Sequence, residues 1–195
     1  MLFRSRYVPI PQRQSVPANL SQITSFISFC GGLPAPEHSN GVLGYKFSWS
    51  PRGVLTAALN DAKFRIDSRQ VSLPGKDLLA SHFSDVPIIR GFRFEGVANR
   101  DSVSYLEQYG LPQDLPTILR GTLRYPNFSK IVDAFKKLGL LELEALEEVP
   151  QRWQDVTDVC LRMKGFKVVD EATRSAAISS LIGDRKSTRL NSSHP

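Results

Sequence analysis

The hydrophobic positions of the chain follow two spacings, one typical of strands and one typical of helices. Short segments that are rich in β-branched or aromatic residues, or that alternate apolar with polar positions, predict strands. These segments are residues 25–30, 45–49, 91–97 and 117–125, together with a hairpin over 63–73 that turns at 67–68. The first of them, Ser25 to Cys30, ends at a glycine pair and has the composition of a buried strand.

Three longer segments have the apolar spacing of helices. They are residues 51–59, 127–138 and 151–163. The second has the clearest apolar stripe, with Asn127 placed to cap its start and Gly139 its end. In the third, the residues predicted to share one side are Trp153, Val156, Val159 and Cys160. Strands mixed with single helices predict an α/β or α+β fold, in which helices pack on a mixed sheet.

The composition is that of one globular domain with two atypical ends. Of the 195 residues, 41% are hydrophobic and 23% are charged. Residues 1–22 and 184–195 show no periodicity, so we expect both ends to be disordered. Because the interior is well patterned and the ends are not, we hypothesise that the ends are non-native sequence. No apolar run is long enough to cross a bilayer, and arginines and prolines interrupt the first twenty residues, so we expect an intracellular protein without a membrane role.

Charge and metal-ligating residues exclude several other classes of function. Six of the 25 basic and one of the 19 acidic residues lie outside residues 23–183, which leaves a balance of 19 against 18, or +1, within that range. It contains no basic run interleaved with aromatic residues, so we expect no nucleic-acid partner. The two cysteines and three histidines show no metal-ligand spacing, and we expect no metal site.

The strand at 117–125 is the most informative candidate for binding. Strand alternation places Arg120, Thr122 and Arg124 on one face. The planar fork of an arginine pairs both oxygens of a carboxylate, so this face suits an acidic ligand, although a solvated sheet face is an equally simple interpretation. On the opposite face, Gly121 leaves room for close approach by another backbone or a ring.

Two aromatic or glycine-rich segments and one arginine add to this candidate. Residues 30–37 can bring backbone amides close to a ligand, or can form a purely structural turn. Residues 43–53 offer aromatic rings that either pack on a cofactor or fill one face of a strand. Arg100 precedes a short helical stretch, where Asp101 or Ser102 can act as the cap and where a positive charge is unfavourable. An anionic partner such as a carboxylate is therefore expected for Arg100.

Four of these segments resemble, in the same order, the saccharopine dehydrogenase family. They are residues 25–37, 43–53, 99–102 and 119–125. The resemblance is strongest over 23–141, and it implies that residues 23–183 form the substrate-binding and dimerisation domain, which the family inserts after a Rossmann domain. No glycine motif of the form GxGxxG occurs here, so we expect the Rossmann domain to be absent and the chain alone to be inactive.

The resemblance implies an oxidoreductase of lysine metabolism that interconverts saccharopine with glutamate and aminoadipate semialdehyde, with NADP or NAD as cofactor. It implies a cytoplasmic protein, saccharopine as ligand and a homodimer. The residues implied to bind saccharopine are Arg100, Thr122, Leu123 and Arg124. Trp49 is implied to contact the cofactor, and no residue is assigned as a general base.

Two alternatives remain open at this stage. The first is the NAD-dependent dehydrogenase module of a bifunctional lysine-degrading enzyme, aminoadipic semialdehyde synthase, which implies a mitochondrial location. The run from Gly91 to Gly96 favours it slightly. The second is a non-catalytic dimerisation or binding module.

Overall fold

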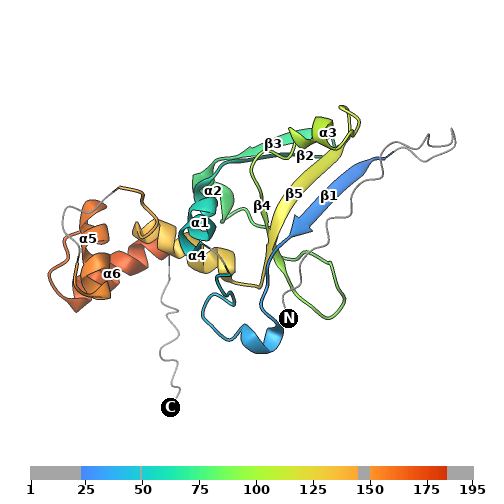
Figure 1. Cartoon of the computed structure of the whole chain (residues 1–195). Helices are drawn as coiled ribbons and strands as arrows, with labels where there is room; N and C mark the ends of the chain where they lie inside the picture. Colours follow the sequence, from blue (N-terminus) through green and yellow to red (C-terminus); the bar gives the residue numbers. More distant parts are fainter. Residues whose placement is uncertain (1–22, 49, 145–149, 184–195) are drawn as a thin grey trace, which may run out of the picture. The chain divides into compact units, whose positions relative to one another are not determined.

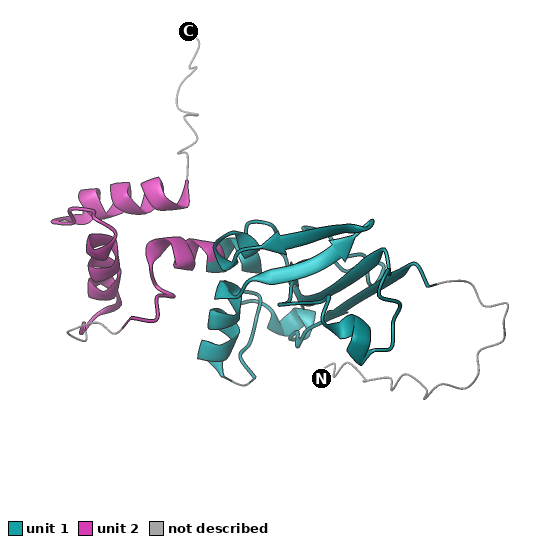
Figure 2. Cartoon of the chain, turned by 90° about the horizontal axis from the view of Figure 1, so that it is seen from above, with its two compact units in different colours: residues 1–132 teal, residues 133–195 magenta. Residues whose placement is uncertain are grey.

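A computed structural model describes residues 23–48, 50–144 and 150–183. The chain divides into two compact units, residues 1–132 and 133–195, which are coloured separately in Figure 2. The ends predicted to be disordered, 1–22 and 184–195, and the predicted cofactor contact Trp49 lie outside the described residues. No helix within the described ranges is long and apolar enough to span a membrane.

Unit 1 is built on a mixed sheet with strand β5 at its centre (Figure 1). Its described strands are β1 (Ser25–Cys30), β2 (Ala62–Ile66), β3 (Arg69–Leu73), β4 (Glu95–Ala98) and β5 (Thr117–Arg124). β1 runs parallel to β5 on one side, while β2 and β4 pair antiparallel with β5 on the other. β3 continues the sheet from β2, so the predicted mixed sheet is confirmed.

The helices of unit 1 are short, except for the one that follows β5. They are η1 (Pro36–His38), α1 (Pro51–Thr56), η2 (Ala57–Leu59), α2 (Gly75–Leu78), α3 (Tyr105–Gln108) and the first part of α4 (Phe128–Leu138). The predicted helix at 51–59 is confirmed as α1 and η2, and the Ser50 side chain caps it by accepting from the Gly53 N–H. The predicted hairpin is confirmed too, with both turn residues at positive φ, as a tight hairpin turn requires.

The two faces of the sheet carry separate apolar clusters. On one face, Leu123 packs with Val86 and Phe94, and the ring of Phe29 lies over Gly121 and Gly96. On the other face, the buried residues are Leu106, Leu115 and Ile118. The predicted room beside Gly121 is therefore filled by a ring from the neighbouring strand.

Three strand predictions need correction. β1 is not buried: within the described residues it forms the edge of the sheet, and the Ile27 side chain is 56% exposed. Residues 45–48 are irregular, because their rings pack on other elements instead of pairing in the sheet. The strand predicted at 91–97 begins only at Glu95, and Phe92 precedes it as an exposed ring.

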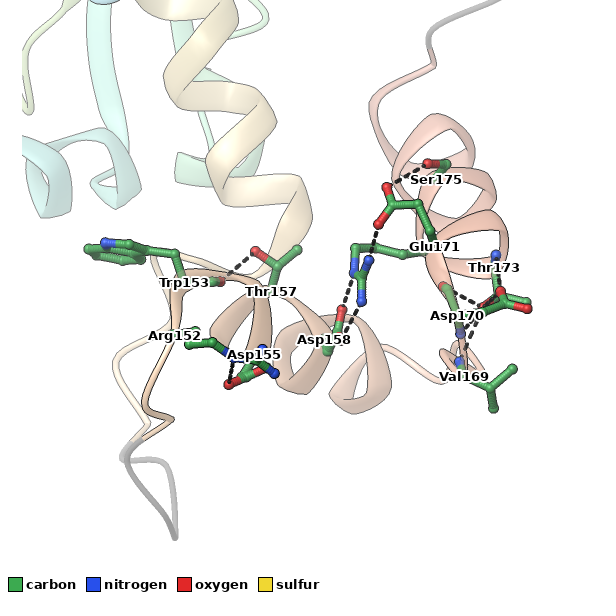
Figure 3. A network of polar contacts seen from close by, with 11 residues as sticks. Arg152, Trp153, Asp155, Thr157, Asp158, Val169, Asp170, Glu171, Thr173 and Ser175 are labelled. Carbon is green, nitrogen blue, oxygen red and sulfur yellow. Dashed lines mark hydrogen bonds and ion pairs between the residues drawn. The ribbon is translucent and has the colours of Figure 1, made fainter.

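Unit 2 contains the second part of α4, α5 (Trp153–Met163) and α6 (Glu171–Ile182). A small core formed by Leu161, Val168 and Ala177 joins α5 to α6. Figure 3 shows the polar contacts of these helices, in which Arg174 bonds Asp158 of α5 and Glu171 of its own helix. The predicted helix at 151–163 is confirmed, but Trp153 does not share its buried side, because this ring is 86% exposed.

Candidate carboxylate-binding site

The polar side of β5 is continued by the neighbouring strand. Arg120, Thr122 and Arg124 are half-buried on one face, whereas the residues between them are buried on the other, as the alternation predicts. Parallel pairing sets Ser28 beside Arg120 and Cys30 beside Thr122. We call these five residues the polar strip. Its two β1 residues are not evident from the pattern of β5, because the pairing partner of a strand cannot be read from the strand itself.

Arg124 is held between two aromatic rings at one end of the polar strip. Its guanidinium carbon lies 4.7 Å from the ring centroid of Tyr45 and 5.0 Å from that of Phe128. Nη1 donates to the carbonyl of Leu123 at 2.7 Å, while Nε is buried and has no hydrogen-bond partner within the described residues. Burial lowers the pKa of Arg124, although the acidic groups of Tyr45, Cys30 and Glu95 act in the opposite direction. A buried donor on a cation is costly to leave unpaired, so this position favours an anionic ligand.

Glu95 lies opposite Arg124 in the sheet, but its carboxylate is used elsewhere. It is only 2% exposed, and its two oxygens accept the backbone N–H groups of Asn127 at 2.9 Å and Ser129 at 2.5 Å. Glu95 therefore caps the start of α4, a role that the sequence analysis assigned to Asn127. This cap holds Phe128 beside the guanidinium of Arg124 and leaves the arginine without a carboxylate within ion-pair distance among the described residues.

Arg120 lies further along the same face. Its guanidinium carbon is 3.6 Å from the ring centroid of Tyr105, a close cation–π contact. Its backbone N–H donates to the Ser102 hydroxyl at 2.9 Å, and its carbonyl accepts from the Asn99 N–H at 2.9 Å. These two bonds attach the segment 99–102 to the strand beside Arg120.

Arg100 is exposed and has a left-handed backbone, with φ at 48°. This conformation is uncommon for a residue with a side chain and is concentrated at functional sites. Asp101 accepts the N–H groups of Val103 and Ser104 in the turn that precedes α3, while Ser102 is fully buried against β5. The prediction that Asp101 or Ser102 caps the helix is wrong, because α3 begins after Ser104 and has no side-chain cap. Asn99, the residue before Arg100, lies opposite Arg120, which is four strand positions from Arg124, or about 13 Å along the sheet.

The loop at 30–37 and the segment before Trp49 meet in a shallow hollow of about 240 Å³. Its lining residues are Gly32, Leu33, Pro34, Ala35, His38, Lys46, Phe47 and Ser48. The hydroxyl of Tyr125 donates to the carbonyl of Pro34 at 2.9 Å and fixes this loop at the end of β5. The structure thus joins the two segments that the sequence analysis treated as separate candidates.

The side chain of Leu123 lies in the apolar cluster on the other face of the sheet, so only its main chain is available beside Arg124. No group of three His, Cys, Asp or Glu side chains within the described ranges is arranged to hold a metal ion.

Similar proteins agree with the resemblance. The family described as "Saccharopine dehydrogenase C-terminal domain" matches residues 12–189, and this match extends at both ends into residues that the structure does not describe. Saccharopine dehydrogenase (NADP(+), L-glutamate-forming) of Schizosaccharomyces pombe is 41% identical over 162 residues, which cover 80% of this chain and 36% of the relative. The mitochondrial alpha-aminoadipic semialdehyde synthase of Mus musculus is 41% identical over 139 residues, which cover 69% of this chain and 15% of the relative.

A solved structure is similar as well. Apo histidine-tagged saccharopine dehydrogenase (L-Glu forming) from Saccharomyces cerevisiae superposes with a TM-score of 0.71 at 39% identity, covering 82% of this chain and 35% of that one. The chain thus spans 36% of the length of its Schizosaccharomyces pombe relative. By its family match and its identity to these relatives, the chain belongs to the saccharopine dehydrogenase family and carries that family's C-terminal domain.

Proposed function

We propose that this chain is the substrate-binding part of a saccharopine dehydrogenase, and that Arg100 and the polar strip bind the carboxylates of saccharopine. The observation that carries the proposal is the environment of the Arg124 guanidinium. Two rings hold its guanidinium, its Nε is buried without a partner, and no carboxylate of the described residues lies within ion-pair distance. An arginine fixed in this way is ready to accept a carboxylate at little further entropic cost.

Saccharopine is an elongated molecule with three carboxylates, so its ligand site needs cations that are spread out. The segment that carries Arg100 meets β5 at Arg120, about 13 Å along the sheet from Arg124, and the hydroxyl of Thr122 and the main chain of Leu123 lie near Arg124. In this proposal the two arginines bind carboxylates at opposite ends of the ligand. Thr122 and Leu123 supply the shorter polar contacts near Arg124.

We further propose that the complete protein transfers a hydride from saccharopine to NADP, the cofactor named for the fungal relatives. Loss of this hydride from the lysine-side carbon next to the secondary amine, together with the proton on the nitrogen, gives an imine, and water then cleaves the imine to glutamate and aminoadipate semialdehyde. Trp49, the next residue in the sequence after Ser48 of the hollow, is the proposed cofactor contact of this chain. The phosphates of the cofactor then need a site beyond this chain, because the sequence has no GxGxxG motif.

The bifunctional semialdehyde synthase remains the second candidate, because its mouse member is also 41% identical to this chain. In that case the cofactor is NAD and the location mitochondrial, instead of NADP and the cytoplasm. Assays of the complete gene product with each cofactor, together with the mass of its polypeptide, separate the two candidates. The mass of the native protein in solution tests the proposed homodimer.

Calorimetric titration of this chain with saccharopine tests the proposal. The variant Arg124→Met keeps an apolar stem between the rings and removes the charge. We expect it to bind about thirty-fold more weakly, as the loss of a charge-assisted hydrogen bond of about 2 kcal/mol implies. Arg69→Met, at an exposed position of β3, is the matched control and retains the affinity. No binding by the unmodified chain, or equal binding by Arg124→Met, contradicts the proposal.

A further inference from the structure

Arg120 has the features of a ligand contact, although the family resemblance did not assign it as one. Its guanidinium lies flat on Tyr105, whose ring centroid is 5.2 Å from that of Tyr109, and the latter ring is in turn 5.3 Å from Phe26. These three packed rings support the long side chain of Arg120 and limit its conformations. Among the described residues, no acidic group lies within ion-pair distance of Arg120, so its charge is not neutralised.

The cations of the site are distributed unevenly. The bonds from Asn99 and to Ser102 keep the segment that carries Arg100 beside Arg120. The segment of a second arginine, Arg100, therefore lies next to Arg120 at one end of the site, whereas Arg124 is the polar-strip arginine at the other end. A ligand that carries two carboxylates at one end and one at the other matches this distribution.

Saccharopine has this arrangement. Its glutarate end carries two carboxylates, whereas its lysine end carries one carboxylate beside an ammonium group. We propose that Arg120 is a specificity-determining residue that pairs with the side-chain carboxylate of the glutarate end, while Arg124 binds the carboxylate of the lysine end. This inference rests on the proposed function. It adds the orientation of saccharopine, with the glutarate end at Arg120 and the lysine end at Arg124.

Two ligands that differ by this carboxylate and the methylene group that carries it test the assignment. N6-(1-carboxyethyl)lysine keeps the lysine end, the secondary amine and its adjacent carboxylate, but lacks the side-chain carboxylate of saccharopine. The unmodified chain should bind saccharopine about thirty-fold more tightly than this analogue, as expected for one charge-assisted contact. In Arg120→Met the preference should fall to about threefold or less, because the residue that reads the extra carboxylate is gone.

Arg124→Met is the matched control, since it removes a cation from the other end. Its affinity for both ligands should fall, while its preference for saccharopine stays near that of the unmodified chain. Arg120→Lys, which keeps a charge over Tyr105 but not the planar fork, should retain part of the preference. Circular dichroism establishes that each variant is folded.

The outcomes separate this inference from the proposed function. If the unmodified chain binds saccharopine and both Arg120 variants keep the full preference, Arg120 does not read the glutarate end and the inference is overturned. If the unmodified chain does not bind saccharopine at all, the proposed function fails and the inference fails with it. If Arg124→Met loses the preference for saccharopine over the analogue and Arg120→Met keeps it, the ligand lies in the opposite orientation. That result also overturns the assignment.

Discussion

At the scale of single residues, Gly121 determines how closely β1 packs on β5. A side-chain carbon at this position would overlap the ring of Phe29, which also covers Gly96. The ring can lie flat on the sheet only because both positions lack a side chain. Arg120 and Thr122 on the other face thereby stay aligned with β1, since a shift of Phe29 would move the strand that carries Ser28 and Cys30.

Substitution of Gly121 should therefore destabilise unit 1. We expect Gly121→Ala to lower the free energy of unfolding by about 1–3 kcal/mol, because the added methyl forces the ring of Phe29 out of its position. Gly41→Ala is the control, since nothing lies within 4 Å of an added carbon there. Urea denaturation followed by circular dichroism measures both. Equal stability of the two variants would show that the ring does not need this space.

The residue-scale features differ in how far they can be predicted. Alternation alone identifies the face of β5 that carries the arginines, because a strand has a period of two. The ring of Phe128 lies only four residues after Arg124, but the ring of Tyr45 beside Arg124 and the carboxylate of Glu95 that caps α4 come from distant segments. No local pattern links them, so these contacts become evident only in the folded chain.

At the scale of elements, α5 and α6 are linked by a single arginine. The guanidinium of Arg174 donates to both oxygens of Asp158, at 2.5 and 2.9 Å, and also pairs with Glu171 (Figure 3). The hydrogen bonds from Arg174 lower the pKa of Asp158. The carboxylate is therefore bound more favourably in the folded state than in the unfolded one.

This link gives the helices of unit 2 an acid-sensitive contribution to stability. A lowered folded-state pKa means that the contribution is complete above the ordinary aspartate pKa of about 4 and is lost as the pH falls through the lowered value. We expect Arg174→Met to destabilise the chain at pH 7 and to differ much less from the unmodified chain at pH 3. Lys167→Met, at an exposed position, is the control. Thermal unfolding at both pH values measures the difference, and a difference that is the same at both would contradict this account.

The sequence predicts the elements with a strong period and misses those without one. The hairpin, α1, β5 and α4 were all evident from the spacing of apolar residues and from turn residues, although the caps of α1 and α4 were not. The helix α6 was missed, because its sequence is rich in alanine and serine and has no clear apolar stripe. Its capping box of Asp170 and Thr173 is the local signal that identifies its start.

At the scale of the whole molecule, the proposed binding residues are all in one unit. Arg100 and the polar strip belong to unit 1, whereas unit 2 has its own core around Leu161 (Figure 2). The chain spans about a third of the length of its fungal relatives. In the proposed function, the carboxylates of the substrate bind to the arginines of unit 1.

The most direct test of this account is a nuclear magnetic resonance titration of the arginine Nε–H signals of this chain with saccharopine, each signal being assigned by an arginine-to-lysine substitution. We predict that the signals of Arg120 and Arg124 shift on binding, because their donors pair with carboxylates. The signals of Arg69 in unit 1 and of Arg152 and Arg174 in unit 2 should keep their positions. If saccharopine leaves the Arg124 signal unchanged, the claim that this arginine binds the substrate is wrong.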